Sequence, residues 1–226
     1  MLSQSSHTLR NECRDFVEWH RGRAPYVLWA IDLDLPPVRA RVAQAAQHLA
    51  SWLLPGYSRE PHVTLDLCGF PASPPVAEDE FCPQVLAAAC AQQAAHFPRP
   101  FVIEIGALDS FSSAPFLHIA DPAGGIAAAR VALAQGGRHR SHNAYLPHLT
   151  VGLYAEDWPA ARVLAEIERY QAPAPLRCAV ERVSLLAYAP QEIGGRLRRV
   201  ADFCLRSRQL LWHEDLRLNA DKMPVF

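Results

Sequence analysis

The chain has 226 residues, of which 50% are hydrophobic, and its formal net charge is −1. A chain of this size and composition can bury a sizeable core as one large domain or two fused lobes. Its balanced charge excludes a global basic field of the kind that attracts long duplex nucleic acid or an anionic membrane. No apolar run reaches the roughly 18 residues of a membrane span, and the first residues lack the charged start and apolar stretch of a signal peptide. With six scattered cysteines and no C-x-x-C pair, a reducing cytoplasm is the expected location, with no membrane partner.

The first half of the chain predicts three strands separated by two helices. Residues 26–32 form an apolar run typical of a buried strand. Pro36 and Pro37 open a helix that Gly56 ends. Residues 62–67 are expected to form the second strand, residues 84–97 an alanine-rich helix stopped by prolines, and residues 101–108 the third strand.

The second half repeats this order. Strands are expected at residues 115–120 and 148–153, with a helix over residues 124–135 between them. Asp157 is expected to cap a helix that runs to about Tyr170. Residues 176–188 and 196–205 then predict two strands around a turn at Gly194-Gly195. The repeated β-α-β-α-β order indicates a duplicated module.

We therefore expect a main domain over residues 25–205, with one lobe over about residues 25–110 and the other over about 111–205. Residues 1–24 are expected to form an extension with a helix that packs onto this body. Residues 206–226 are expected to form a second extension that covers an edge or a groove.

Two copies of a P-H-x-T tetrapeptide stand out, in a chain with only three threonines. They are Pro61-His62-Val63-Thr64 and Pro147-His148-Leu149-Thr150. Composition alone gives about 0.01 such matches, so a pair is a specific signal. In a strand, residues i and i+2 point to the same face, so each copy offers an imidazole beside a hydroxyl. Each copy falls on the middle strand of its module, which makes the two copies halves of one expected site.

Paired histidines are suited to acid–base chemistry at a phosphodiester. One neutral imidazole can deprotonate a nucleophile while a protonated partner donates to the leaving oxygen. The Thr64 and Thr150 hydroxyls and nearby N–H groups can hold non-bridging phosphate oxygens, and the imidazolium supplies positive charge without a metal. The two histidine roles exchange when the reaction is reversed; for cyclic phosphate hydrolysis we expect His148 as base and His62 as acid.

The chain resembles the 2H phosphoesterase superfamily, in particular its 2′-5′ RNA ligase-like and cyclic phosphodiesterase members. The paired H-x-T motifs carry the resemblance, and two flanking segments extend it over about residues 26–205. Residues 29–32 followed by Leu35-Pro36-Pro37 are similar to the family's first strand and "lpp" turn, and residues 62–69 are close to its H-x-T-L-x-[FL]-x-G strand.

The resemblance implies an α/β (α+β) fold: a bilobal, duplicated β-α-β-α-β module with pseudo-two-fold symmetry and antiparallel-rich sheets around a central cleft. It also implies metal-independent hydrolysis of 2′,3′-cyclic or 2′-5′ phosphodiester bonds, with no cofactor. The expected partner is a nucleotide cyclic phosphate or a short RNA end, and we expect a monomer.

One departure concerns the basic residue that many relatives carry shortly after the second motif, because residues 151–154 have none. Phosphate binding is expected to depend instead on the loop before that motif, with candidates Arg138, His139, Arg140 and His142. Tyr57, just ahead of the first motif, is a candidate for stacking on a base. Phe111 and Phe116 are interpreted as core residues, and His118 as a strand histidine with a bonded partner.

Two alternatives stay open. The first is a module on the same fold that binds RNA or nucleotide without turnover. The second is a metalloenzyme with histidine ligands, although the spacing of His139, His142 and His148 matches no firm zinc pattern.

Overall fold

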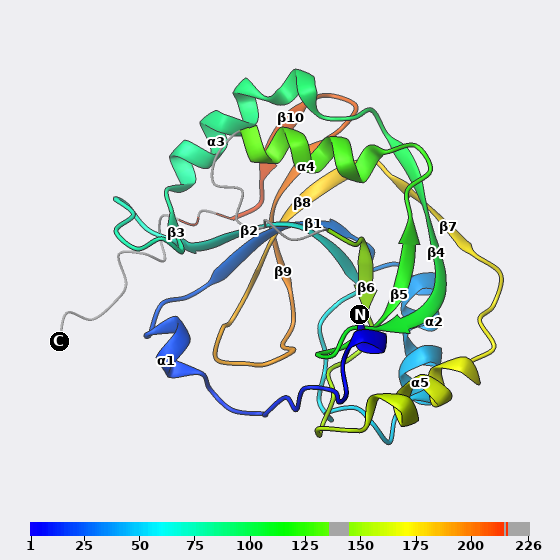
Figure 1. Ribbon diagram of the computed structural model, residues 1–226. Helices are drawn as coiled ribbons and strands as arrows, with labels where there is room; N and C mark the ends of the chain where they lie inside the picture. Colours follow the sequence, from blue (N-terminus) through cyan, green and yellow to red (C-terminus); the bar gives the residue numbers. More distant parts are fainter. Residues whose placement is uncertain (136–144, 215, 217–226) are drawn as a thin grey trace.

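The computed structural model describes residues 1–135, 145–214 and 216, and two curled β-sheets form its centre (Figure 1). The first sheet has the strand order β10-β9-β8-β1-β2-β3 and the second β6-β5-β4-β7. Neighbouring strands are antiparallel except for the parallel pair β2 and β3. The expected α+β architecture with antiparallel-rich sheets is therefore confirmed.

The strands of the first sheet are β1 (Tyr26–Asp32), β2 (His62–Pro71), β3 (Glu80–Phe81), β8 (Arg182–Tyr188), β9 (Arg198–Cys204) and β10 (Gln209–Trp212). Those of the second are β4 (Phe101–Ser110), β5 (Pro115–Ala120), β6 (His148–Thr150) and β7 (Leu176–Val180). The α-helices are α1 (Val17–His20), α2 (Pro36–His48), α3 (Pro83–Gln92), α4 (Gly125–Gln135) and α5 (Ala160–Glu168). Short 3₁₀ turns occupy Leu2–Gln4 and Ala94–His96.

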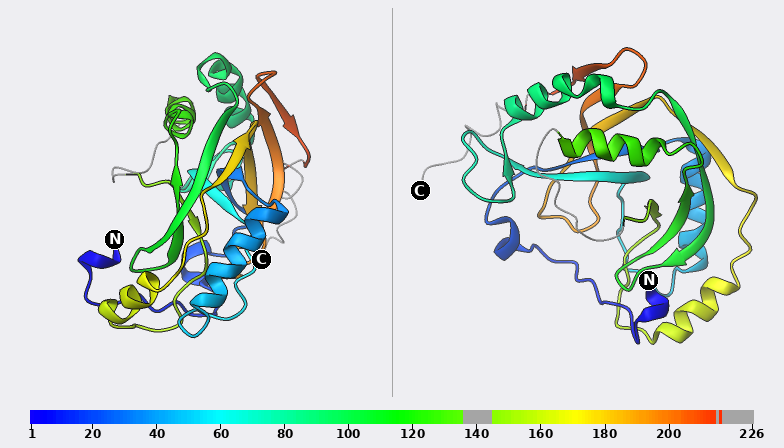
Figure 2. Two further views of the ribbon diagram at one scale, coloured as in Figure 1. Left: turned by 90° about the vertical axis from the view of Figure 1, so that its right-hand side faces the viewer. Right: turned by 45° about the horizontal axis from the view of Figure 1, so that its top comes forward.

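The helices lie in two groups outside the sheets. Helices α3 and α4 lie side by side at one end of the molecule, and α2 and α5 lie at the other (Figure 2). Prolines at the first positions start α2 and α3, where the missing N–H group costs no hydrogen bond. The Asp121 carboxylate accepts hydrogen bonds from the N–H groups of Gly125 and Ile126 and so caps α4. Within the described residues, no helix is both long enough and apolar enough to cross a membrane.

One face of each sheet is buried in the core, and the motif side chains are on the other face. Val63 and Leu65 of β2 are fully buried in the main hydrophobic cluster, together with Leu149 of β6. Side chains alternate along a strand, so the neighbouring His62 and His148 point away from that cluster. Both are largely covered but keep some exposure to solvent, as expected for groups that line a cleft.

In both sheets the motif histidine is the first residue of its strand and pairs with an antiparallel neighbour, but the residues opposite the two motifs differ. His62 lies opposite Asp32 and Thr64 opposite Ala30 in the first sheet. His148 lies opposite His118, and Thr150 opposite Phe116, in the second.

Several sequence expectations hold, and others need correction. The bounds of β1 and β5 are confirmed as residues 26–32 and 115–120. The run at residues 176–188, expected as one strand, breaks at Glu181 because the chain there leaves the second sheet as β7 and enters the first as β8. Helix α2 ends at His48 rather than near Gly56, and β6 stops at Thr150 rather than at residue 153.

The sheets also do not follow the expected boundary between lobes near residue 110. Strand β4 joins the second sheet because a short loop returns it antiparallel to β5. Strands β8 and β9 join the first sheet beside β1, so that each sheet is completed by strands from the other half of the chain.

The extensions contain the expected helix and edge-covering segment, and only the cap of α5 needs correction. Residues 1–24 contain only the 3₁₀ turn and the short helix α1, in an otherwise extended path. Asp157 does not cap α5, because the N-terminal segment supplies the partners there: Ser6 O accepts a bond from the Ala160 N–H, and Thr8 Oγ1 from the Trp158 N–H. In the C-terminal extension, β10 covers the edge of β9 as a paired strand.

Candidate active site

His62, at the start of β2, is oriented by the backbone of its own loop. Its Nδ1 lies 2.8 Å from the carbonyl oxygen of Glu60. A carbonyl oxygen can only accept a hydrogen bond, so Nδ1 carries the proton and the neutral ring has its lone pair on Nε2. The Glu60 carboxylate is fixed in turn by the Leu197 N–H at 2.6 Å and by Arg196 Nε at 2.9 Å.

His148, at the start of β6, repeats this arrangement. Its Nδ1 lies 2.9 Å from the carbonyl oxygen of Leu146, again two residues earlier and across a proline. Phe111 meets the imidazole edge-on, with ring centroids 4.9 Å apart, and is itself stacked on Phe116 at 4.4 Å. The two motifs therefore hold their imidazoles in the same tautomer, each leaving Nε2 for a ligand.

Direct contacts join the two motif strands although they belong to different sheets. The Tyr145 hydroxyl, three residues before His148, donates a hydrogen bond of 2.7 Å to the carbonyl oxygen of Thr64. The guanidinium of Arg130 lies 3.6 Å from the centroid of the Tyr145 ring. The Tyr145 bond therefore ties the segment that leads into β6 to β2, and both histidines line the same pocket.

All four motif side chains line one pocket of about 410 Å³. This volume is within the range of small-molecule sites. Its other walls come from the loop before β2, the β4–β5 loop, the β8–β9 loop and the N-terminal segment. The lining residues from these parts are Tyr57, Arg59, Phe111, Ser113, Ala114, Pro190, Glu192, Ile193, Gly194, Asn11, Phe16 and Trp19, and Leu153 after β6 and Tyr188 at the end of β8 complete the lining.

Burial sets the protonation of the two histidines. Burial lowers the pKa of His62 to about 4; the hydrogen bond to Glu60 raises it, and the charges of Arg59 and His148 lower it. Burial also lowers the pKa of His148, against the hydrogen bond to Leu146, which raises it. Both imidazoles are therefore mostly neutral at pH 7.

Arg59 is the cation of this pocket that sequence reasoning missed. Its guanidinium lies 4.1 Å from the centroid of the Tyr188 ring, and its Nε donates to the carbonyl oxygen of Gly195 at 3.1 Å. Among the described residues it has no carboxylate within ion-pair distance. A positioned guanidinium without a counter-charge is suited to binding phosphate oxygens. The one feature of the sequence that could have indicated this role is the position of Arg59 three residues before His62.

The structure brings some of the expected residues to the pocket and leaves others elsewhere. Tyr57 lines it, packed against Gly194, and burial raises the pKa of its hydroxyl to about 12, so the hydroxyl stays protonated. Phe111 also lines it, although it was interpreted as a core residue, whereas Phe116 is fully buried. His118 is outside the pocket lining, with Nε2 3.0 Å from Asp109 Oδ2. The four candidates Arg138, His139, Arg140 and His142 lie outside the described residues.

A metal-binding cluster is not found in the part of the chain that the structure describes: no three His, Cys, Asp or Glu side chains there converge as ligands. The loop that contains His139 and His142 is outside that part.

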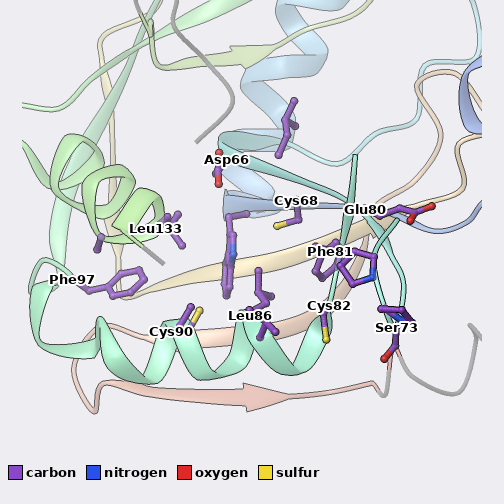
Figure 3. A pocket seen from close by; sticks show the side chains of 17 residues that line it. Asp66, Cys68, Ser73, Glu80, Phe81, Cys82, Leu86, Cys90, Phe97 and Leu133 are labelled. Atoms are coloured by element: carbon purple, nitrogen blue, oxygen red, sulfur yellow. The ribbon is translucent and has the colours of Figure 1, made fainter. Parts of the chain in front are cut away.

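A second hollow, of about 460 Å³, lies between β2 and helices α3 and α4 (Figure 3). Figure 3 shows Cys68, Phe81, Leu86 and Leu133 around it. Unlike the pocket between the two motifs, its described lining residues include no histidine, the side chain that most readily exchanges a proton near neutral pH. The pocket between the two motifs is therefore the candidate active site.

Comparisons with known proteins agree with this geometry. TT0787 of Thermus thermophilus superposes with a TM-score of 0.58 at 17% identity, covering 80% of this chain and 98% of that one. The crystal structure of E. coli LigT in complex with 3′-AMP superposes with a TM-score of 0.52 at 20% identity, covering 80% of this chain and 98% of that one. A crystal structure described as a phosphoesterase superposes with a TM-score of 0.51 at 20% identity, covering 81% of this chain and 99% of that one. At such identities the likeness concerns the fold.

No curated protein matches the chain in sequence. A family model described as the 2′-5′ RNA ligase superfamily, however, matches residues 35–192. That region is more than half of the chain and contains both H-x-T motifs. The protein therefore belongs to the 2′-5′ RNA ligase superfamily, in agreement with its resemblance to the 2H phosphoesterases.

Proposed function

We propose that the protein is a metal-independent phosphodiesterase that hydrolyses the 2′,3′-cyclic phosphate of a nucleotide or a short RNA end. The observation that carries the proposal is the pair of equivalent imidazoles. Each has Nδ1 bound to a carbonyl two residues earlier, and both line one pocket. Membership of the superfamily supports a phosphoesterase-type activity.

In this reaction one Nε2 removes a proton from water as its oxygen attacks phosphorus. The bond from phosphorus to one ring oxygen breaks, and the other imidazole gives that oxygen a proton. The active form therefore needs one neutral and one protonated histidine. An anionic phosphodiester raises the pKa of both groups, because it stabilises their charged forms.

The pKa values favour His62 as the base and His148 as the acid in hydrolysis. The pKa of His62 is lowered to about 4, so this imidazole keeps its lone pair free to accept a proton near neutral pH, and the role of proton donor falls to His148. This assignment reverses the one expected from the sequence, in which the burial of each imidazole was unknown.

Substrate oxygens are held by three groups in the proposed mode. Arg59 supplies positive charge and two guanidinium nitrogens beyond the Nε that binds Gly195. The hydroxyls of Thr64 and Thr150 have no side-chain hydrogen-bond partner among the described residues, and both threonines line the pocket. The crystal structure of E. coli LigT with 3′-AMP shows a structural relative holding a nucleotide, which supports a nucleotide ligand here.

The test is turnover of a substrate panel with and without EDTA. We expect hydrolysis of 2′,3′-cyclic nucleotides to a phosphomonoester, unchanged by EDTA, and a comparison with 2′-5′ linked dinucleotides identifies the preferred bond. Loss of activity in EDTA that zinc restores would instead indicate a histidine-ligated metalloenzyme. Tight nucleotide binding without turnover of any substrate would indicate a binding module.

A further inference from the structure

The N-terminal segment before β1 forms a wall of the active-site pocket. We call residues 7–24 the strap. They precede the region matched by the family model, which begins at residue 35, yet three strap residues line the pocket: Asn11, Phe16 and Trp19. In Figure 1 the strap is the dark blue segment that runs from the N-terminus past α1 to β1.

One end of the strap is bonded to the loops around the second sheet. The N–H of Leu9 donates to Ser112 O at 2.7 Å, and that of Asn11 to Tyr154 O at 3.0 Å. The side-chain amide of Asn11 also donates to the carbonyl oxygens of Ser113 and Tyr154, at 3.2 and 3.1 Å. These bonds fix the strap next to the loop that contains Phe111.

The other end is fixed to the first sheet. Arg23 makes two hydrogen bonds to the Asp79 carboxylate, at 2.6 and 2.8 Å, and its guanidinium lies 4.2 Å from the centroid of the Phe70 ring. The strap therefore connects the two sheets, and the residues between its ends are held beside the pocket.

Trp19 is held beside the pocket by packing against other aromatic rings. Its centroid lies 5.2 Å from that of Tyr26 and 5.7 Å from that of Phe70, and the side chain is nevertheless 40% exposed. Tyr26 continues to Tyr188 at 5.4 Å, and the Arg59 guanidinium lies 4.1 Å from the Tyr188 ring. One row of packed rings thus leads from Trp19 to the phosphate-binding cation.

The other aromatic side chains of the pocket are each packed against a neighbour, and Tyr57 lies against Gly194. The guanidinium of Arg14 lies 3.8 Å from the centroid of Phe16. Phe111 is stacked on Phe116 and Tyr188 lies between Tyr26 and Arg59, as described above. A ring that is fixed from behind and exposed in front is a preorganised stacking surface, and Trp19 fits that description.

We propose that the strap supplies a nucleobase subsite in which Trp19 stacks on the base of the substrate. The proposal rests on the proposed function for the position of the phosphate, and it adds that the substrate is a nucleotide recognised by its base as well as by its phosphate. Stacking needs only the π face of a base, so both purines and pyrimidines are accepted.

The test separates base recognition from catalysis. Trp19→Ala, Trp19→Phe and Val17→Ala are compared with the wild type; Val17 is on the same short helix, is 60% exposed and does not line the pocket. For each, kcat/KM is measured with adenosine 2′,3′-cyclic phosphate and with the base-free glycerol 1,2-cyclic phosphate. Affinities for adenosine 2′-monophosphate and for glycerol 2-phosphate are measured by calorimetry, which requires no turnover.

We expect Trp19→Ala to lower kcat/KM for the nucleotide and affinity for adenosine 2′-monophosphate by roughly 5- to 150-fold, the range of base–aromatic stacking. Values for the glycerol compounds should stay unchanged, Trp19→Phe should recover most of the loss, and Val17→Ala should behave as the wild type. Equal losses for nucleotide and glycerol compounds would overturn the proposal, as would a base preference that Phe111→Ala removes and Trp19→Ala does not. If the wild type turns over neither substrate, the proposed function fails, and the binding data alone decide on the subsite.

Discussion

Replacing Arg59 by glutamine is expected to weaken the enzyme at its phosphate-binding step. The guanidinium is placed by the Tyr188 ring at 4.1 Å and by the bond from Nε to Gly195 O at 3.1 Å. A hydrogen bond to a charged group contributes about 1.5–3 kcal/mol, which corresponds to a fall in kcat/KM of about 10- to 150-fold.

The same substitution has a second expected effect, on proton transfer. The charge of Arg59 lowers the pKa of His62, so its removal should raise that pKa. The rising limb of the profile of kcat/KM against pH, which reports the base of the free enzyme, should then move to higher pH.

The fold should survive this change. The lost cation–π contact and side-chain bond together are worth about 1–2 kcal/mol. The measurements are kcat/KM for adenosine 2′,3′-cyclic phosphate across pH, NMR titration of the His62 imidazole, and thermal unfolding. Arg206→Gln is the matched control, since Arg206 is 78% exposed and does not line the pocket. Removal of a phosphate contact should lower kcat/KM by much more than about 3-fold. A value for Arg59→Gln within about 3-fold of the control would therefore refute the reasoning.

Three further outcomes are expected. His62→Ala and His148→Ala should each lower kcat by about 10²- to 10⁴-fold while the circular dichroism spectrum stays unchanged. Full activity in either variant would contradict the proposed acid–base roles of the two histidines. Because burial lowers the pKa of both histidines below the ordinary 6.5, the form with one neutral and one protonated imidazole is most populated in acid. The bell-shaped profile of kcat/KM against pH should therefore have its maximum below pH 6.5. A maximum above about pH 7.5 would show that burial does not lower the pKa values of the two histidines. Tyr145→Phe should lower the free energy of unfolding in urea by about 1–2 kcal/mol, because it leaves Thr64 O without its donor. Tyr170→Phe removes a buried hydroxyl that has no hydrogen-bond partner among the described residues, so it should leave that free energy unchanged or raise it; an equal loss in both variants would argue against the Tyr145 bond.

Local patterns in the sequence determined the strands and the repeated motif. The bounds of β1 and β5 follow from short apolar runs, and the side-chain period of two places His62 beside Thr64 and His148 beside Thr150 on one face each. The duplication of the tetrapeptide was enough to identify the superfamily that the family model supports.

Long-range pairing decided the rest. The run at residues 176–188 has the pattern of one strand, and only the tertiary structure shows that it passes from one sheet to the other at Glu181. Arg59 gave no sequence signal as strong as a motif, because its role depends on Tyr188 and Gly195, more than 120 residues away in the chain.

The sequence by itself therefore determined which residues are the candidates for the chemistry, because acid–base groups and strand periodicity are local properties. The tertiary structure decided how those residues are tuned and what surrounds them. The low pKa of His62 comes from burial by distant segments, and Trp19 reaches the pocket because the strap is bonded to both sheets. Burial and packing depend on which segments meet in space, and a sequence pattern does not contain that information.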